Sequence, residues 1–317
     1  MQIPFIGRFY EAISEPPLVA SPPPKPPKIG LALGAGAARG WAHIGVLQEL
    51  EAQGIVPDVI AGASIGAVVG GCYAAGKLAE IEAFARSLTP RRIFSLMDIT
   101  FSGAGLLGGG RLKTLLDRTL GDATIENLPI AFGAVATELN SGHEVWLTHG
   151  GLSEAVRASY ALPGIFEPVR IGGRWLFDGA LVNPVPVTVC RALGAEVVIA
   201  VNLISDSFSR AGMVSDALAP GRAGGKGVPP QPHYSSRDVA VPGIANALMD
   251  AFNITQDRIA RSRLAGDPPD VMIKARTGKI GLFDFHRAAE LIDMGRESVR
   301  RSLPDLLLET GLGAKTG

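Results

Sequence analysis

The amino-acid sequence predicts an α/β fold in which helices cover both faces of a largely parallel sheet. Short apolar runs, of which 29–33 is the first, alternate along the chain with helical patterns, as they do where both faces of a sheet are buried. The first two of these runs each lead into a glycine-rich turn. With 317 residues, of which 47% are hydrophobic and 19% charged, the chain has enough apolar material for a large core. Length alone leaves one large domain or two small ones open.

The first elements follow the order strand, turn, helix, strand, turn, helix. The apolar run 29–33 forms the first strand, and a helical pattern covers 41–54, where a glycine ends it. A second strand is predicted at 56–61 and a second helix at 67–75, with the turn 62–66 between them. Because ligands of such folds bind at the carboxyl ends of the strands, both glycine-rich turns lie where a site is expected.

Later elements extend the sheet and add two hairpins. Strands are predicted at 131–137, 144–148, 169–171, 174–177 and 196–202, and helices at 188–193, 244–264 and 285–301. The turn Asn140-Ser141-Gly142 separates the first two of these strands, and Gly172-Gly173 is typical of a hairpin between the next two. The stretch 205–242 is rich in Ser, Gly and Pro, and it predicts a long flexible loop.

Composition and charge exclude several classes of protein. Thirty Lys and Arg residues balance thirty Asp and Glu residues, so the formal net charge is +0, and no nucleic acid is expected as a partner. Cys72 and Cys190 have the small apolar neighbours of buried thiols, which favours a reducing compartment. The uncharged run 59–76 has the length of a membrane span, but five glycines interrupt it. Because no export signal is recognised, we expect a cytoplasmic protein.

An apolar N-terminal arm precedes the main domain. Ile6, Phe9, Tyr10 and Ile13 lie on one face of a short predicted helix, and a proline-rich linker follows it. Two interpretations are open. The arm packs on its own domain, or the stretch 3–13 makes peripheral contact with a membrane or a partner chain.

A serine motif follows the second predicted strand. Gly62-Ala63-Ser64-Ile65-Gly66 matches the pattern G-x-S-x-G between a strand and a helix. A sharp turn there holds a nucleophile in a strained backbone conformation, and the two glycines let neighbouring chain approach closely. Ser64 would present its hydroxyl at a helix N-terminus, where amide dipoles favour developing negative charge. The alternative is that Ser64 is an ordinary N-cap residue of a buried helix.

The glycine-rich segment 34–40 also joins a strand to a helix. A dinucleotide-binding loop would need glycine where Arg39 stands, and an acidic residue at the end of the second strand, where Gly62 and Ser64 stand. The other interpretation is an oxyanion hole, in which backbone N–H groups stabilise the charged oxygen of a tetrahedral intermediate. Its donors would be the amides of Gly34, Ala35, Gly36 and Ala37. The P-loop pattern is absent from the sequence.

A serine nucleophile needs a group that takes its proton. Among the five histidines, His43 has apolar neighbours in the first helix and is expected to be a core residue, whereas His286 has the chain position of an α/β-hydrolase histidine. Asp178 is the better candidate, because it ends a predicted strand, precedes Gly179-Ala180 and places a carboxylate among apolar residues. The alternative is a plain aspartate of a hairpin turn.

Together these segments resemble the patatin-like phospholipases, and more narrowly the bacterial members similar to the catalytic domain of neuropathy target esterase. The matching residues are Gly34-Ala35-Gly36-Ala37-Ala38-Arg39-Gly40 with His43-Ile44-Gly45-Val46-Leu47, Gly62-Ala63-Ser64-Ile65-Gly66, Ala158-Ser159, Pro163-Gly164, Asp178-Gly179-Ala180, Asn183-Pro184-Val185-Pro186 and Gly281-Leu282-Phe283-Asp284-Phe285-His286. The resemblance extends from about Lys28 to Val299, and the proline-rich arm and the loop 205–242 depart from it.

The resemblance implies a three-layer α/β/α domain around a mixed, largely parallel sheet. It also implies the hydrolysis of acyl esters, with phospholipids and lysophospholipids foremost, by a Ser-Asp dyad that needs no histidine, metal or cofactor. Carried over by position, Ser64 is the nucleophile, Asp178 is its base, and Gly34, Ala35, Gly36 and Ala37 form the oxyanion hole, with Arg39, Gly62, Gly66 and Gly179 in supporting positions. A serine acyltransferase and a nucleotide-binding regulator without catalysis remain as alternatives.

The expected organisation has three parts. An N-terminal arm with its linker covers 1–27, the hydrolase domain covers 28–302 and includes the loop 205–242, and a C-terminal tail covers 303–317. The protein is expected in the cytoplasm, with peripheral contact to a membrane as one possibility.

Overall fold

The computed structural model describes residues 25–96, 105–107, 110–204 and 243–315. Within this part of the chain, the central sheet has eight strands in the order β10-β9-β1-β2-β4-β8-β7, and β5 pairs with β4 in addition. Its strands are β1 (Ile29–Leu33), β2 (Val59–Ala63), β4 (Ala131–Glu138), β5 (Glu144–Leu147), β7 (Val169–Ile171), β8 (Arg174–Asp178), β9 (Val197–Asn202) and β10 (Val271–Lys274). A second sheet consists of β3 (Gly105–Leu107) and β6 (Gly164–Phe166).

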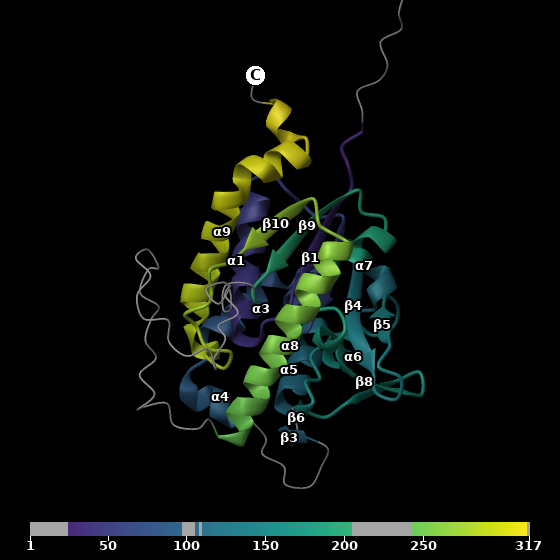
Figure 1. Cartoon of the computed structure of the whole chain (residues 1–317), viewed down its shortest axis with the longest axis vertical. Helices are drawn as coiled ribbons and strands as arrows, with labels where there is room; N and C mark the ends of the chain where they lie inside the picture. Colours follow the sequence, from purple (N-terminus) through teal and green to yellow (C-terminus); the bar gives the residue numbers. More distant parts are fainter. Residues whose placement is uncertain (1–24, 97–104, 108–109, 205–242, 316–317) are drawn as a thin grey trace, which may run out of the picture.

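Helices cover both faces of the central sheet (Figure 1). They are α1 (Ala42–Ala52), α2 (Ile65–Ala74), α3 (Leu78–Arg86), α4 (Pro90–Leu96), α5 (Gly110–Leu120), α6 (Leu152–Ser159), α7 (Val187–Ala192), α8 (Ile244–Gly266) and α9 (Ala288–Glu309), with short 3-10 turns η1 (Ala37–Trp41), η2 (Ile125–Asn127), η3 (Gly179–Leu181), η4 (Phe285–Arg287) and η5 (Leu312–Lys315). One hydrophobic cluster joins Leu31 of β1 to α1, α2 and α9, and another joins Ala32 to α7 and α8 on the opposite face. The predicted three-layer α/β/α architecture is therefore confirmed.

The sheet is mixed, as predicted. β10, β9, β1, β2 and β4 are parallel, whereas β5 and β8 are antiparallel to β4. The end of the sheet at which β10, β9, β1 and β2 finish is called the carboxyl edge below. The segment 275–287, which connects β10 to α9, lies at this edge and packs on the glycine-rich loop, since the amide of Ala38 donates to the carbonyl of Leu282 at 2.9 Å.

The second strand lies further along the chain than predicted, from Val59 to Ala63 instead of 56–61. β2 continues beyond the predicted end at Ala61, because Gly62 and Ala63 still pair with Ala134 and Val135 of β4. The predicted turn 62–66 is thereby reduced to the single residue between β2 and α2.

The end of the chain and the middle region also differ from the sequence prediction. α9 continues past its predicted end near Arg301 to Glu309, because Leu306 is fully buried. Helices α3 to α6 and strands β3, β6 and β10 had no sequence prediction, since they carry no recognised motif. The predictions for 3–13 and 205–242 lie outside the described residues, and the domain boundaries stay predictions.

None of the helices in the described part combines the length and the apolar character that a bilayer crossing requires.

Two glycines bring α1 and α9 into close contact. A Cβ added at Gly45 of α1 would overlap the backbone oxygen of Ile292, and one added at Gly295 of α9 would overlap that of Ala42. The two helix backbones therefore touch directly. Because η1 packs on α9 as well, this contact also holds the end of the glycine-rich segment.

Replacement of Gly295 by Ala should therefore destabilise the fold. The new methyl group would push the two helices apart, and overpacking of this kind costs about 1–3 kcal/mol of unfolding free energy. The measurement is thermal unfolding followed by circular dichroism. Gly266→Ala is the matched control, because its Cβ would have open space at the end of α8. Equal melting temperatures for wild type and Gly295→Ala would contradict the close approach.

Candidate active site

Ser64 occupies a strained turn between β2 and α2. Its φ is 56°, a left-handed conformation that costs a non-glycine residue on the order of 1–3 kcal/mol. The turn is possible because both flanking glycines lack a side chain. A Cβ at Gly62 would lie 2.5 Å from the backbone nitrogen of Ala67, and one at Gly66 would overlap the carbonyl oxygen of Leu33.

Strand β4 places this turn beside Asp178. Ala63, the last residue of β2, pairs with Val135, and Asp178, the last residue of β8, pairs with the next residue, Ala136. The ends of the two strands therefore meet at the carboxyl edge. The hydroxyl of Ser64 donates a hydrogen bond of 2.7 Å to Oδ2 of Asp178. Close contact also requires Gly179, because a Cβ there would overlap the carbonyl oxygen of Val135.

The carboxylate of Asp178 is buried, with 2% of its surface exposed. Its Oδ1 accepts the amide of Ala180 at 2.8 Å, and its Oδ2 accepts the hydroxyl of Ser64. Burial raises the pKa of Asp178 to about 7, and the two hydrogen bonds lower it only in part. The carboxylate can therefore accept and return a proton near neutral pH.

Two side chains that the sequence motifs did not single out for a role hold the pair in place. The hydroxyl oxygen of Ser159, at the end of α6, accepts the backbone N–H of Ser64 at 3.0 Å, and Ser159 is fully buried. Thr137 of β4 donates its hydroxyl to the carbonyl of Asp178 at 2.8 Å. Ser159 belongs to the family resemblance, but only the folded structure shows that its hydroxyl reaches the serine turn.

The glycine-rich loop offers fewer donors than the sequence predicted. The amide of Gly34 donates to the carbonyl of Val201 at 3.1 Å, and that of Ala35 donates to Pro184 at 2.9 Å. These two amides fix the loop to β9 and to the segment before α7, so they are not available to an oxyanion. Within the described residues, the amides of Gly36 and Ala37 have no protein acceptor. The oxyanion hole of four amides is therefore corrected to a candidate pair.

The geometry of this pair favours the correction. Ala37 has a positive φ of 48°, and it lines the same cavity as Ser64 and Asp178. Helix α1 also holds the loop, because Nε2 of His43 donates to the carbonyl of Gly34 at 2.7 Å. Burial lowers the pKa of His43 to about 4, so this imidazole is neutral and structural, as the sequence predicted.

Arg39 joins the loop to the segment 275–287. Its Nε donates to the carbonyl of Ile280 at 2.8 Å, which agrees with a supporting position. His286, on η4 of the same segment, is exposed, and no hydrogen bond in the described part of the chain connects it to Ser64 or Asp178. Across the described residues, no three His, Cys, Asp or Glu side chains gather as a metal site would require.

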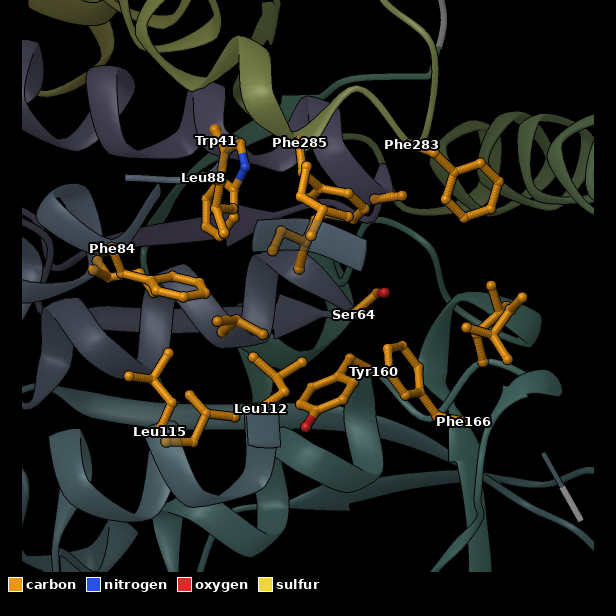
Figure 2. Close-up of a pocket in the computed structure, with 18 of the residues that line it drawn as sticks. Trp41, Ser64, Phe84, Leu88, Leu112, Leu115, Tyr160, Phe166, Phe283 and Phe285 are labelled. Atoms are coloured by element: carbon orange, nitrogen blue, oxygen red, sulfur yellow. The ribbon is translucent and has the colours of Figure 1, made fainter. Parts of the chain in front are cut away.

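An apolar cavity of about 200 Å³ opens beside Ser64 (Figure 2). Figure 2 shows Ser64 between Phe84 and Leu115 on one side of the view and Phe283 and Phe166 on the other. The lining consists of Ala37, Trp41, Ser64, Ile65, Val68, Ile81, Phe84, Leu88, Ile93, Leu112, Leu115, Leu116, Tyr160, Leu162, Ile165, Phe166, Asp178, Phe283 and Phe285. Most of these side chains are hydrocarbon, so the cavity suits a flexible apolar chain.

The chain is similar to several known proteins. Residues 31–191 match the family model described as patatin-like phospholipase. An uncharacterised NTE family protein of Mycobacterium tuberculosis is 33% identical over 87% of this chain and 91% of its own length. A protein of Saccharomyces cerevisiae named as a lysophospholipase is 34% identical over 55% of this chain, but the match covers 11% of that protein. The crystal structure of VipD from Legionella pneumophila aligns with a TM-score of 0.47 and 14% identity over 89% of this chain and 67% of that one.

The burial of Asp178 predicts a pH-dependent gain of stability in the variant Asp178→Asn. The pKa is about 7 in the folded protein and about 3.9 in the unfolded chain, so ionisation of this group destabilises the fold by up to about 4 kcal/mol. Because the raised pKa belongs to the folded state, wild type keeps its full stability below about pH 4, where Asp178 is protonated in both states. It loses that stability progressively as the pH rises through 7. The amide does not ionise. Urea unfolding should show a larger stabilisation at pH 8 than at pH 5, and a difference independent of pH would contradict the raised pKa.

Proposed function

The chain belongs to the patatin-like phospholipase family, and from this premise we propose that it hydrolyses acyl esters of lipids, with Ser64 as nucleophile and Asp178 as general base. One observation carries the proposal. The hydroxyl of Ser64 is hydrogen-bonded to the buried carboxylate of Asp178 at 2.7 Å, on the wall of an apolar cavity. A nucleophile within reach of a base is what acyl transfer requires, and the apolar wall accounts for the lipid character of the substrate.

In the first half of the reaction, Oδ2 of Asp178 takes the proton of the Ser64 hydroxyl while Oγ attacks the ester carbonyl. The amides of Gly36 and Ala37 are the proposed donors to the resulting oxyanion. Collapse of the intermediate breaks the ester bond. Protonated Asp178 then gives its proton to the leaving alcohol, and the acyl group stays on Ser64.

In the second half, water replaces the alcohol. Asp178 takes a proton from the water as its oxygen attacks the acyl-serine carbonyl, and the same amides stabilise the oxyanion. The bond to Ser64 breaks, Asp178 returns the proton to the serine oxygen, and a free fatty acid leaves. In each half, a proton therefore moves from one oxygen atom to Asp178 and from there to another oxygen atom, so no histidine is needed.

The pKa of the base decides which bonds the site cleaves. A carboxylate whose pKa burial has raised to about 7 is a stronger base than an ordinary aspartate and still a usable acid. Alkoxide leaving groups of lipid esters need less protonation than amine leaving groups of peptides. We therefore expect esterase activity with little peptidase activity.

The substrate class follows from the cavity and from the relatives. The apolar lining fits an acyl chain, whose carbonyl would lie at Ser64 and whose tail would extend toward Phe84 and Leu115 (Figure 2). The yeast relative is named as a lysophospholipase, which supports a lysophospholipid or phospholipid substrate here. The mycobacterial relative, which matches most of both chains, is named only by family.

The test of the dyad is covalent labelling with a fluorophosphonate probe, followed by intact mass. Wild type should gain one adduct as Ser64 Oγ displaces fluoride, and Ser64→Ala should gain none. Asp178→Asn should react about 10²–10⁴-fold more slowly, because general base catalysis is lost. The rate for wild type should rise about tenfold per pH unit below pH 7 and then level, since the ionised form of Asp178 is the base.

The controls for labelling test whether each variant is folded. Asp178→Asn is nearly isosteric, and its unfolding curve shows whether slow labelling reflects chemistry or loss of structure. Equal labelling rates for wild type and a folded Asp178→Asn would contradict the dyad. Failure of folded wild type to label would instead favour the nucleotide-binding alternative.

The cavity predicts an effect of Leu115 on acyl length. Leu115→Trp should fill the end remote from Ser64, lowering kcat/KM for a hexadecanoyl ester at least tenfold while sparing a butanoyl ester, because only the long chain reaches that end. The measurement is kcat/KM for both esters. Leu308→Trp is the control, since Leu308 is 75% exposed on α9. Equal losses on both esters would place the acyl tail elsewhere.

A further inference from the structure

The carboxyl edge carries exposed apolar and cationic side chains that the proposed chemistry does not use. The apolar ones are Leu248, 66% exposed, and Phe283, 47% exposed. The cations are Arg91, Arg92, Arg276 and Lys279, all of them exposed. We propose that these six side chains, named the docking face below, bind the protein to a lipid surface that carries negative charge. This inference rests on the proposed function, because it explains how a lipid ester reaches Ser64.

Topology places all three contributing segments at the same edge. β9 and β10 are parallel neighbours, so α8 between them runs antiparallel to both and begins at the carboxyl edge. Leu248 belongs to the first turns of α8. Arg276, Lys279 and Phe283 follow the end of β10 directly, and α4, which carries Arg91 and Arg92, packs on η4 of the same segment. Figure 1 shows α4 and the start of α8 at the end of the molecule where β3 and β6 lie.

The ion pairing of these cations can be followed within the described part of the chain. Among the described residues, Arg91, Arg92, Arg276 and Lys279 form no ion pair. Among the described residues of this end, Asp250 is exposed on α8 and Glu167 is exposed after β6, whereas Asp284 accepts the amide of Gly281 at 2.9 Å and lies 3.8 Å from Arg287.

Charge is distributed unevenly over the described residues. The whole chain has a formal net charge of +0, whereas these four cations gather at one edge and form no ion pair within the described part of the chain, so they contribute a local positive charge there. Arg276 and Lys279 are exposed along a segment whose Ala275 and Thr277 are buried. The backbone therefore directs these cations to solvent, where anionic lipid head groups would attract them.

Two contacts connect the docking face to the cavity. Phe283 lines the cavity and is half exposed, so one side chain belongs to both. The guanidinium of Arg92 lies over the ring of Phe84, another lining residue, at 5.8 Å. With this edge on a bilayer, an acyl chain would pass along Phe283 from lipid to cavity without crossing water. Charge and apolar exposure thus coincide at the entrance that a lipid substrate needs.

The experiment measures sedimentation with vesicles, in the Ser64→Ala background so that the lipid stays intact. The protein should bind phosphatidylglycerol-rich vesicles, bind phosphatidylcholine vesicles much more weakly, and be released by 1 M salt. Arg91→Gln combined with Lys279→Gln should lower the partition coefficient about 25-fold, since each cation near such a surface contributes about fivefold. Leu248→Ser should lower it on both vesicle types.

Lys25→Gln combined with Lys28→Gln is the matched control. Both lysines are exposed and precede β1, at the opposite edge of the sheet, so removing the same number of charges there should leave binding unchanged. Binding that is independent of lipid charge, or equal losses in the two double variants, would overturn the docking face. Unchanged vesicle binding with a raised KM for a monomeric anionic lysophospholipid would also overturn it, in favour of recognition of a single head group.

Turnover of a soluble butanoyl ester separates this inference from the proposed function. In proteins that retain Ser64, both double variants should hydrolyse that ester at the wild-type rate, because their changes lie outside the cavity lining. Hydrolysis without binding to anionic vesicles would overturn the docking face alone. Absence of hydrolysis by wild type would contradict the proposed function, whatever the vesicles show.

Discussion

The register of β4 is the constraint on which the rest of the site depends. Ala63 and Asp178 pair with consecutive residues of this strand, one through a parallel ladder and the other through an antiparallel one. A shift of either strand by one residue would turn its side chains to the other face of the sheet, and the hydrogen bond between Ser64 and Asp178 would be lost. The mixed sheet matters to the chemistry, because β8 runs antiparallel to β4 and its last residue, Asp178, stops beside the end of β2.

Burial of Asp178 connects stability to chemistry. The same desolvation that raises its pKa to about 7 makes the ionised form unfavourable in the folded protein. Strain at Ser64 adds a second unfavourable term, since its φ is 56°. Both are balanced by a core of parallel strands covered on two faces and by the direct contact of α1 with α9. The packing of the whole domain therefore maintains a buried carboxylate and a strained turn that are each locally unfavourable.

The sequence could predict the parts of the site that local geometry determines. A strand-to-helix turn and a strand end leave local signals that make Ser64 and Asp178 candidates, the family resemblance implies their roles, and the structure brings the two side chains together. The donors of the loop could be predicted only in part, because the acceptors that occupy the amides of Gly34 and Ala35 come from Val201 and Pro184, far along the chain. The contact of Ser159 with the serine turn could not be predicted for the same reason. The cavity walls could not be predicted at all, since α3, α4 and α5 supply ordinary apolar residues with no motif.

The residues of the serine turn and the lining of the cavity differ in how freely they can be replaced. The residues that carry the proposed chemistry are fixed by close backbone contacts, and a Cβ at Gly62, Gly66 or Gly179 would collide with neighbouring backbone. The lining side chains from α3 to α5 have no such restriction, because one apolar residue can replace another at small cost when its volume is kept. Acyl selectivity can therefore change without disturbing Ser64 and Asp178. Surface attachment can vary as well, since the exposed cations of the docking face form no ion pair within the described residues.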